Sequence, residues 1–214
     1  LFNGRIQNLL PFLYGKKESF IVNANVYCPN FHLDQFLGVS EEKGNKDYKG
    51  FGFPSFAEMY LHLKVDSFRF KKFHASDITS QIYYGPGLLK CTQTQFAALK
   101  GQAQSDLIIE LTHNKHLKFS GKSELKNIDV HMLFDQFNNF GQSAIEGKNI
   151  RGIADASGLF SVEWDDKLSM INDQIKITAN VHIRQGELIA YEPMQALSKH
   201  IAVEELERIK FDRL

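Results

Sequence analysis

The residues that could hold a metal ion are scattered along this chain. His113 and His116 lie three residues apart beside an expected turn at 112–115, but the surrounding sequence offers no complete set of tetrahedral zinc ligands. The other histidines occur singly, several of them at outward positions of expected strands, where a polar side chain belongs. We therefore predict a solvated turn at 112–115, with neither a metal site nor a cofactor.

Motifs for catalysis are also missing. No Gly-x-Ser-x-Gly elbow occurs, and the stretch 50–54 has two glycines without a third, followed by a proline that would spoil the helix start of a phosphate loop. The acidic pairs at 165–166 and 204–205 are adjacent in sequence, whereas general acid and base catalysis needs carboxylates on opposite sides of a cleft. We expect a binding or scaffold module that is not an enzyme. An enzyme whose site is assembled from distant loops is kept as a third possibility, beside the two binding functions given below.

The composition fits a β-rich domain without a strongly charged surface. The 214 residues include 25 basic and 25 acidic side chains, so the net charge is zero and nucleic acid is not an expected partner. The 18 Phe and 7 Tyr residues suit pleated, half-buried surfaces. The sequence contains no run of about 18 apolar residues, the length needed to span a bilayer. Cys28 and Cys91 could pair or remain separate thiols.

Alternation of apolar and polar residues predicts that most of the chain is β-strand. In the segment 58–70, Met59, Leu61, Leu63 and Val65 share one face, opposite polar residues. The short intervals between such segments predict an antiparallel meander, interrupted by a mobile loop at 38–54. The expected strands are 19–27, 58–70, 73–83, 88–99, 102–111, 116–126, 150–164, 174–184 and a short strand through Tyr191.

One segment has helical periodicity instead. We expect a helix over about 130–146, with Asp129 as its N-cap and Gly147 as its stop. Its apolar side would pack across one end of the sheet, in which case replacing Phe137 with Ala should cost about 3–5 kcal/mol. Short helices and a final strand are expected after Pro193. The three aromatic residues expected to anchor the main helix are Phe134, Phe137 and Phe140.

The expected fold class is α+β and β-dominated, with a strongly twisted antiparallel sheet that forms an open groove. A single helix cannot cover eight or more strands, so part of the apolar face should stay exposed. A groove of this length could hold a lipid, because each buried methylene contributes about 0.8 kcal/mol. The alternative is that the same face closes on itself as a sandwich or on the helix.

The second half of the chain resembles a known family. The residues that carry the resemblance lie at 126–130, 133–142, 149–152, 165–168, 183–188, 192–198 and 206–211, and they include Asn138, Asn139, Gly141, Gln142, Gly152, Gly186, Glu187, Leu188, Pro193 and Phe211. In order and spacing they are similar to the C-terminal region of the AsmA family of Gram-negative envelope proteins, in its Bacteroidetes-type form. The resemblance covers 120–214 and is weaker over 1–119, which would be a repeat-like β-groove segment of the same continuous unit.

The resemblance implies a function in outer-membrane biogenesis. Relatives resemble bridge-like carriers that pass phospholipid along a β-groove, so phospholipid is the expected partner and the periplasm the expected location. The inner-membrane helix of full-length members is not in this chain, and we expect the chain to be a piece of a longer protein. The alternative function is a protein-interaction module that helps outer-membrane proteins assemble, for instance by pairing at an exposed sheet edge.

Overall fold

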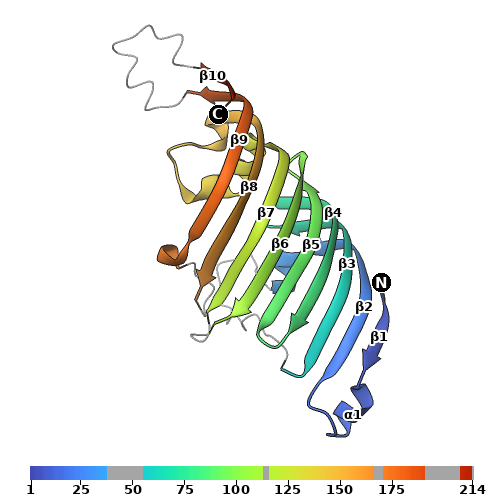
Figure 1. Ribbon diagram of the computed structural model, residues 1–214. Coiled ribbons are helices and arrows are strands. Elements are labelled where there is room, and N and C mark those ends of the chain that lie inside the picture. The colour runs from blue at the N-terminus through green and yellow to red at the C-terminus, as the bar shows by residue number, and fades with distance from the viewer. Residues whose placement is uncertain (38–54, 113–115, 166–170, 191–207, 214) are drawn as a thin grey trace.

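Ten strands form a single mixed sheet in which each strand pairs with the next one along the chain (Figure 1). The computed structural model describes residues 1–37, 55–112, 116–165, 171–190 and 208–213. The strands are β1 (Phe2–Gln7), β2 (Phe20–His32), β3 (Ala57–Phe70), β4 (Phe73–Gly85), β5 (Leu88–Ala98), β6 (Gly101–Leu111), β7 (Leu117–Asp129), β8 (Ile150–Trp164), β9 (Lys176–Ile189) and β10 (Arg208–Arg213).

The direction of one strand pair differs from the prediction. β2 and β3 run parallel, whereas the other neighbouring strands are antiparallel. Parallel neighbours need a crossover between them, and the chain places 24 residues, 33–56, between these two strands. The predicted β-dominated fold is confirmed, and the prediction of a wholly antiparallel sheet is wrong.

The strand positions follow the alternation of the sequence closely. β3 to β8 begin and end within about three residues of the predicted segments. β9 joins two predicted segments into one strand, and β2 continues five residues beyond its predicted end. β1 and the short helices α1 (Leu9–Leu13) and α2 (Leu33–Leu37) were not predicted. The expected loop at 38–54 and the expected helices after Pro193 lie outside the described residues.

Bulges interrupt the side-chain alternation of several strands. Asp77, Gln93, Asn127 and Gln185 have a positive φ within a strand, as has Gly152, and the pairing register shifts beside them. Such a bulge returns the next side chain to the face that the strand would otherwise have left. Apolar residues on both sides of each bulge therefore share one face of the sheet.

The main helix is much shorter than predicted. α3 (Val130–Gln136) has seven residues, so the expected helix over 130–146 is wrong in its extent. Its N-cap is Asp129 as predicted, because the carboxylate accepts a hydrogen bond from the N–H of Met132 at 3.1 Å. Gly147 does not end this helix and instead begins a separate turn. Two 3-10 turns follow α3, η1 (Asn138–Gly141) and η2 (Gly147–Asn149), and a third, η3 (Asn172–Gln174), precedes β9.

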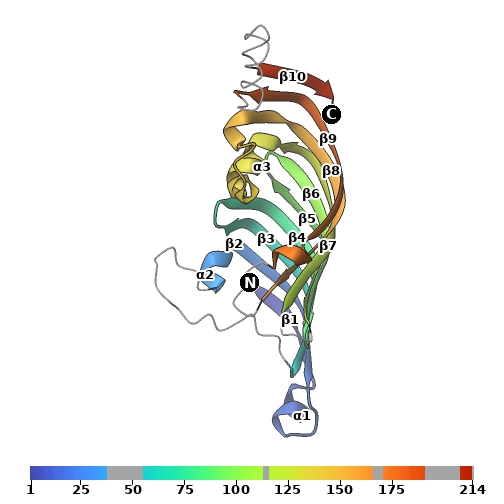
Figure 2. The ribbon, with the colours of Figure 1, turned by 90° about the vertical axis from the view of Figure 1, so that its left-hand side faces the viewer.

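α3 lies on the concave side of the curved sheet (Figure 2). Met132 and Leu133 pack against a buried cluster of sheet and turn residues, and Phe134 packs against a second cluster. The two clusters form the core that joins the helix to the sheet. The first contains Ala75, Ala98, Leu99 and Ile128, and the second contains Val130, Ile150 and Ala154. Among the described residues, no helix is long and apolar enough to cross a membrane.

Candidate functional site: one apolar face across the sheet

Strand pairing aligns apolar residues into rows that cross the sheet. One row passes through β1 to β8, and each member is the pairing partner of the next. We call the face that carries these rows the apolar face. The members of this first row are Ile6, Val22, Met59, Tyr84, Leu89, Ile109, Phe119 and Val162.

A second row lies two residues further along each strand and reaches β9. It also consists of apolar residues and small residues, without a charged side chain. Nine successive strands thus contribute to one continuous apolar surface, about 40 Å wide at the usual strand spacing. The members of this second row are Gly4, Ala24, Leu61, Ile82, Cys91, Leu107, Gly121, Phe160 and Ile177.

The opposite face is mainly polar along the same strands, although it also carries apolar residues such as Ile108 and Leu159. In β7, Lys118, Ser120, Lys122, Glu124 and Lys126 lie on this opposite face. Surface ion pairs link some of these residues to β6 and to each other, such as Lys118 with Glu110 at 3.2 Å. Along these strands, charged side chains therefore gather on the face opposite the two apolar rows.

Hydroxyl groups form a short polar line in the middle of the apolar face. The Ser80 and Thr94 hydroxyls are 2.8 Å apart, and those of Ser105 and Ser123 are 2.7 Å apart. Thr94 and Ser105 are pairing partners, so the line crosses β4 to β7. Because these hydroxyls bond to each other, the line adds little polarity to the face.

The coverage of the apolar face is uneven. α3 packs over the strand ends around Ala75 and Ala98, and α1 packs through Phe12 against Phe20 at the opposite end of β2. Residues near the edges of the sheet are exposed, for example Val181 at 56%. Such an exposed apolar surface is typical of a binding site for an apolar ligand or partner.

Two cysteines and the single tryptophan lie on the apolar face. Cys28 and Cys91 are both free thiols, and burial raises the pKa of Cys91 to about 11. A thiol with this pKa is protonated at neutral pH and behaves as a small apolar group. Trp164, the single tryptophan, is the pairing partner of Leu117 and packs on Phe119 with ring centroids 4.3 Å apart.

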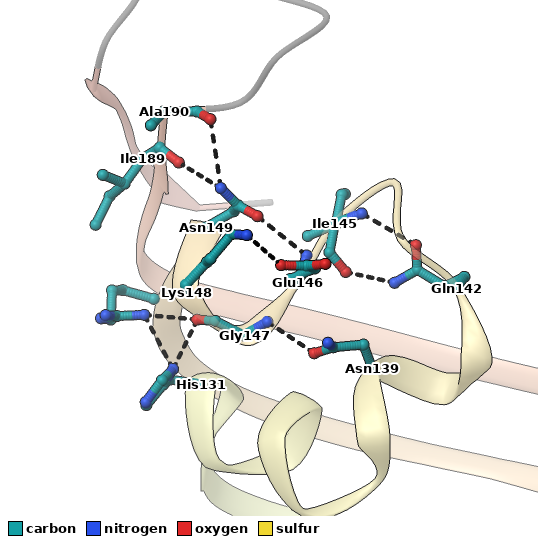
Figure 3. Close-up of polar contacts among 11 residues, drawn as sticks. His131, Asn139, Gln142, Ile145, Glu146, Gly147, Lys148, Asn149, Ile189 and Ala190 are labelled. Atoms are coloured by element: carbon teal, nitrogen blue, oxygen red, sulfur yellow. Dashed lines mark hydrogen bonds and ion pairs between the residues drawn. The ribbon is translucent and has the colours of Figure 1, made fainter.

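The turns after α3 are held by amide side chains of the resemblance motif. The Asn139 side chain accepts a hydrogen bond from the Gly147 N–H at 2.9 Å (Figure 3). Gln142 accepts from the Ile145 N–H at 3.0 Å and donates to the Ile145 carbonyl. Asn149 donates to the carbonyl of Ile189 at 3.1 Å, which ties η2 to β9 (Figure 3).

A cationic side chain adds to this cluster of turns. Arg151 donates to the Gly147 carbonyl at 2.7 Å, and Nδ1 of His131 lies 2.6 Å from the same oxygen (Figure 3). The Arg151 guanidinium is also 3.0 Å from His131 Nδ1. This arrangement joins α3, η2 and β8 through one carbonyl.

The remaining motif residues have structural positions. Leu188 packs against the Val130 cluster, and Phe211 lies so close to Gly186 that a Cβ there would overlap its ring. Gly152 has a φ of 140°, which a side chain would disfavour. Asn138 and Gly141 are exposed with positive φ, Glu187 is half-buried, and Pro193 lies outside the described residues.

The three predicted anchors are not equivalent. Phe134 packs against the cluster of Val130, Ile150 and Ala154. Phe137 and Phe140 are 44% and 55% exposed, with their rings stacked 5.8 Å apart. The structure therefore places one anchor in the core and two at the surface.

The described residues contain no group of three or more His, Cys, Asp or Glu side chains that could hold a metal ion. His116 Nδ1 lies 3.7 Å from a carboxylate oxygen of Glu163, and His113 falls in a part of the chain that is not described. Of the acidic pairs, only Asp165 is described. Asp129, the N-cap of α3, forms an ion pair with Lys100 at 2.8 Å.

Comparison with protein-family models, with curated proteins and with solved structures finds no match.

Proposed function

We propose that this chain is a non-enzymatic lipid-binding segment of an AsmA-like envelope protein, in which acyl chains lie on the apolar face. The observation that carries the proposal is the uninterrupted run of apolar and small residues across nine paired strands. A soluble β-sheet usually hides such a face against a second layer. Here α3 packs over one end of it.

The chemistry of the face suits acyl chains better than a polar ligand. Its protonated Cys91 thiol and its paired hydroxyls offer few hydrogen-bonding groups. Each methylene taken from water onto such a surface contributes up to about 0.8 kcal/mol, so a chain of about 16 carbons could bind without a polar anchor. We propose phospholipid as the ligand because the AsmA resemblance points to it, and outer-membrane biogenesis as the process.

The proposal is tested by native mass spectrometry of the chain purified from a bacterial envelope, followed by organic extraction and lipid analysis. We expect phospholipid to be enriched relative to a β-rich control protein of similar size. A protein that is consistently free of lipid after gentle purification would contradict the proposal.

A pair of variants on β9 locates the lipid. Val181 and Ile177 lie on the apolar face and are exposed, whereas Asn180 is an exposed residue on the opposite face of the same strand. I177K/V181K should reduce the bound lipid severalfold, because it places two charges where acyl chains would lie. N180K adds a similar charge without touching that face and should retain lipid at the wild-type level.

The second candidate is a protein-interaction module that adds a strand at β1. All six residues of β1 are exposed, and among the described strands only β2 pairs with it. A free strand edge can bind an extended peptide through its backbone. Lipid-free protein that captures outer-membrane proteins, and loses them when Arg5 is replaced by Pro, would favour this function.

A further inference from the structure

A line of phenylalanine rings runs along one rim of the apolar face. Phe31 and Phe68 have ring centroids 5.9 Å apart, and Phe68 and Phe73 lie 6.3 Å apart. Phe73 then contacts Phe137 at 5.4 Å, and Phe137 stacks on Phe140 at 5.8 Å. The line therefore connects the ends of β2 and β3 with the exposed surface of the turn η1.

This turn has an unusual backbone. Asn138, Asn139 and Phe140 have φ between 51° and 54°, and Gly141 follows with φ of 71°. Asparagine and glycine tolerate this left-handed region, whereas an aromatic residue is disfavoured there by its Cβ. The conformation is maintained by the hydrogen bond from the Gly147 N–H to Asn139.

The consequence of this backbone is an exposed aromatic pair. The stacked rings of Phe137 and Phe140 have interplanar angle 9° and are both about half exposed. Phe134 meets the edge of Phe140 at 5.3 Å, so the pair is fixed to the helix rather than free to fold down. A strained turn that presents apolar rings to solvent is typical of a functional contact.

We propose that the Phe137–Phe140 pair is the entry lip for lipid, where it contacts the hydrocarbon of a phospholipid bilayer and passes an acyl chain onto the apolar face. This inference rests on the proposed function and adds a place of entry to it. The occupant is a membrane lipid because the pair is continuous, through Phe73 and Phe68, with the face that holds acyl chains in the proposal.

The lip controls the rate of transfer, while the apolar face sets how much lipid is bound. Phe137 and Phe140 lie at the rim and contribute little of the surface that several strands supply. Removing the pair should therefore slow uptake from vesicles without changing the amount bound at equilibrium. A residue inside the acyl-chain site would change both quantities.

The test follows uptake of a fluorescent phospholipid from donor vesicles of phosphatidylethanolamine and phosphatidylglycerol that also contain a quenching lipid. F137A/F140A should lower the initial rate about tenfold, the order expected from losing apolar contact of one to two aromatic rings. F140D, which places a charge on the exposed ring position, should have at least as large an effect. Lipid supplied from detergent should load all variants to the wild-type amount.

The matched control is L159A, because Leu159 is a similarly exposed apolar residue on the polar face. It should take up lipid at the wild-type rate. If both F137A/F140A and F140D take up lipid at the wild-type rate, the proposed entry lip is wrong, while the proposed lipid binding still stands. Equal loss of the rate and of the final bound amount would also overturn it. A wild-type protein that takes up no lipid, from vesicles or from detergent, would overturn the proposed function and the lip together.

Discussion

At the scale of single residues, the aromatic side chains after α3 divide between core and surface. Phe134 packs against Val130, Ile150 and Ala154, whereas Phe137 is 44% exposed. The cost of truncation depends on the apolar surface that a side chain buries and on the cavity that its loss leaves. The position in sequence therefore says less about stability than the contacts of each ring.

We predict that Phe134→Ala lowers the free energy of unfolding by about 3 kcal/mol, while Phe137→Ala lowers it by about 1 kcal/mol. The larger loss reflects a cavity beside Val130, and the smaller one reflects a ring that keeps much of its solvent contact. Urea unfolding of the two variants measures the difference. The sequence-based figure of about 3–5 kcal/mol for Phe137 depends on a long helix that the structure does not contain. A loss in that range for Phe137→Ala would contradict the exposed position.

The cap of α3 makes stability depend on pH. Partial burial opposes ionisation of Asp129, but hydrogen bonds from Lys100 and from the Met132 N–H outweigh it and lower the pKa of the carboxyl. An Asp with a lowered pKa in the folded state stabilises the protein fully above its unfolded pKa, near 4. The contribution is lost as pH falls through the folded value.

We predict that Asp129→Ala destabilises the protein by about 1 kcal/mol at pH 7 and by less as the pH falls below about 4. Thermal unfolding of wild type and variant between pH 7 and pH 3 gives this difference. Asp135→Ala is a suitable control for the loss of an exposed ion-paired carboxylate in the same helix, since Asp135 pairs with Lys72 at 3.7 Å. A difference in stability between wild type and Asp129→Ala that grows as the pH falls would contradict the lowered pKa of Asp129.

At the scale of elements, the bulges use carboxylates from neighbouring strands. The N–H of Gln93 donates to Asp106 at 2.7 Å, and the N–H of Asn127 donates to Asp155 at 2.8 Å. Each bulge frees a backbone donor from the strand ladder, and a nearby Asp accepts from it. These two aspartates therefore help to keep the apolar residues of β5 and β7 on one face.

We predict that Asp106→Ala costs about 1–2 kcal/mol, because it leaves the Gln93 N–H without its carboxylate partner. Glu110→Ala on the same strand and the same face should cost less than about 0.5 kcal/mol, since its partner is the exposed Lys118. Chemical unfolding of both variants tests the contrast. Similar costs would show that the bulge does not depend on Asp106.

The elements also show which features could be predicted from sequence. Alternation of apolar and polar residues predicts the bounds of β3 and β6 well, because apolar side chains pack on one face of the sheet and polar side chains face solvent on the other. Alternation does not encode whether neighbours run parallel, so the β2 and β3 pair was missed. Phe137 and Phe140 continue the helical spacing, but α3 ends at Gln136 and Phe140 lies in a left-handed turn. The hydrogen bond from the Gly147 N–H to Asn139 helps to hold this turn.

The functional surface was only partly visible in the sequence. The apolar side of each strand could be predicted, but its continuity needs the pairing register of all strands. The bulges at Asp77, Gln93 and Asn127 hide it further, because they shift the alternation by one residue. An Asp, Asn or Gln at a point in a strand where the alternation shifts by one residue is the signal that could have revealed these bulges. The AsmA resemblance and its lipid function stay predictions.

At the scale of the whole molecule, the sheet separates an apolar face from a charged one. Rows of paired residues connect β1 to β9, so a ligand on this face could contact many strands at once. α3 lies on the concave side of the curved sheet (Figure 2), where it packs against the cluster around Ala75 and Ala98. A molecule built this way suits the extended apolar ligand that we propose.

The single tryptophan gives the most direct measurement of the central claim, that acyl chains lie on the apolar face. Trp164 packs on Phe119 within that face, so a brominated acyl chain bound there would quench its fluorescence by contact. We predict strong quenching by phospholipids with brominated chains and none by the same lipids without bromine. The matched control, Y60W/W164F, moves the fluorophore to the exposed Tyr60 position on the polar face and should not be quenched. No bromine quenching of Trp164, or equal quenching of both proteins, would contradict the account.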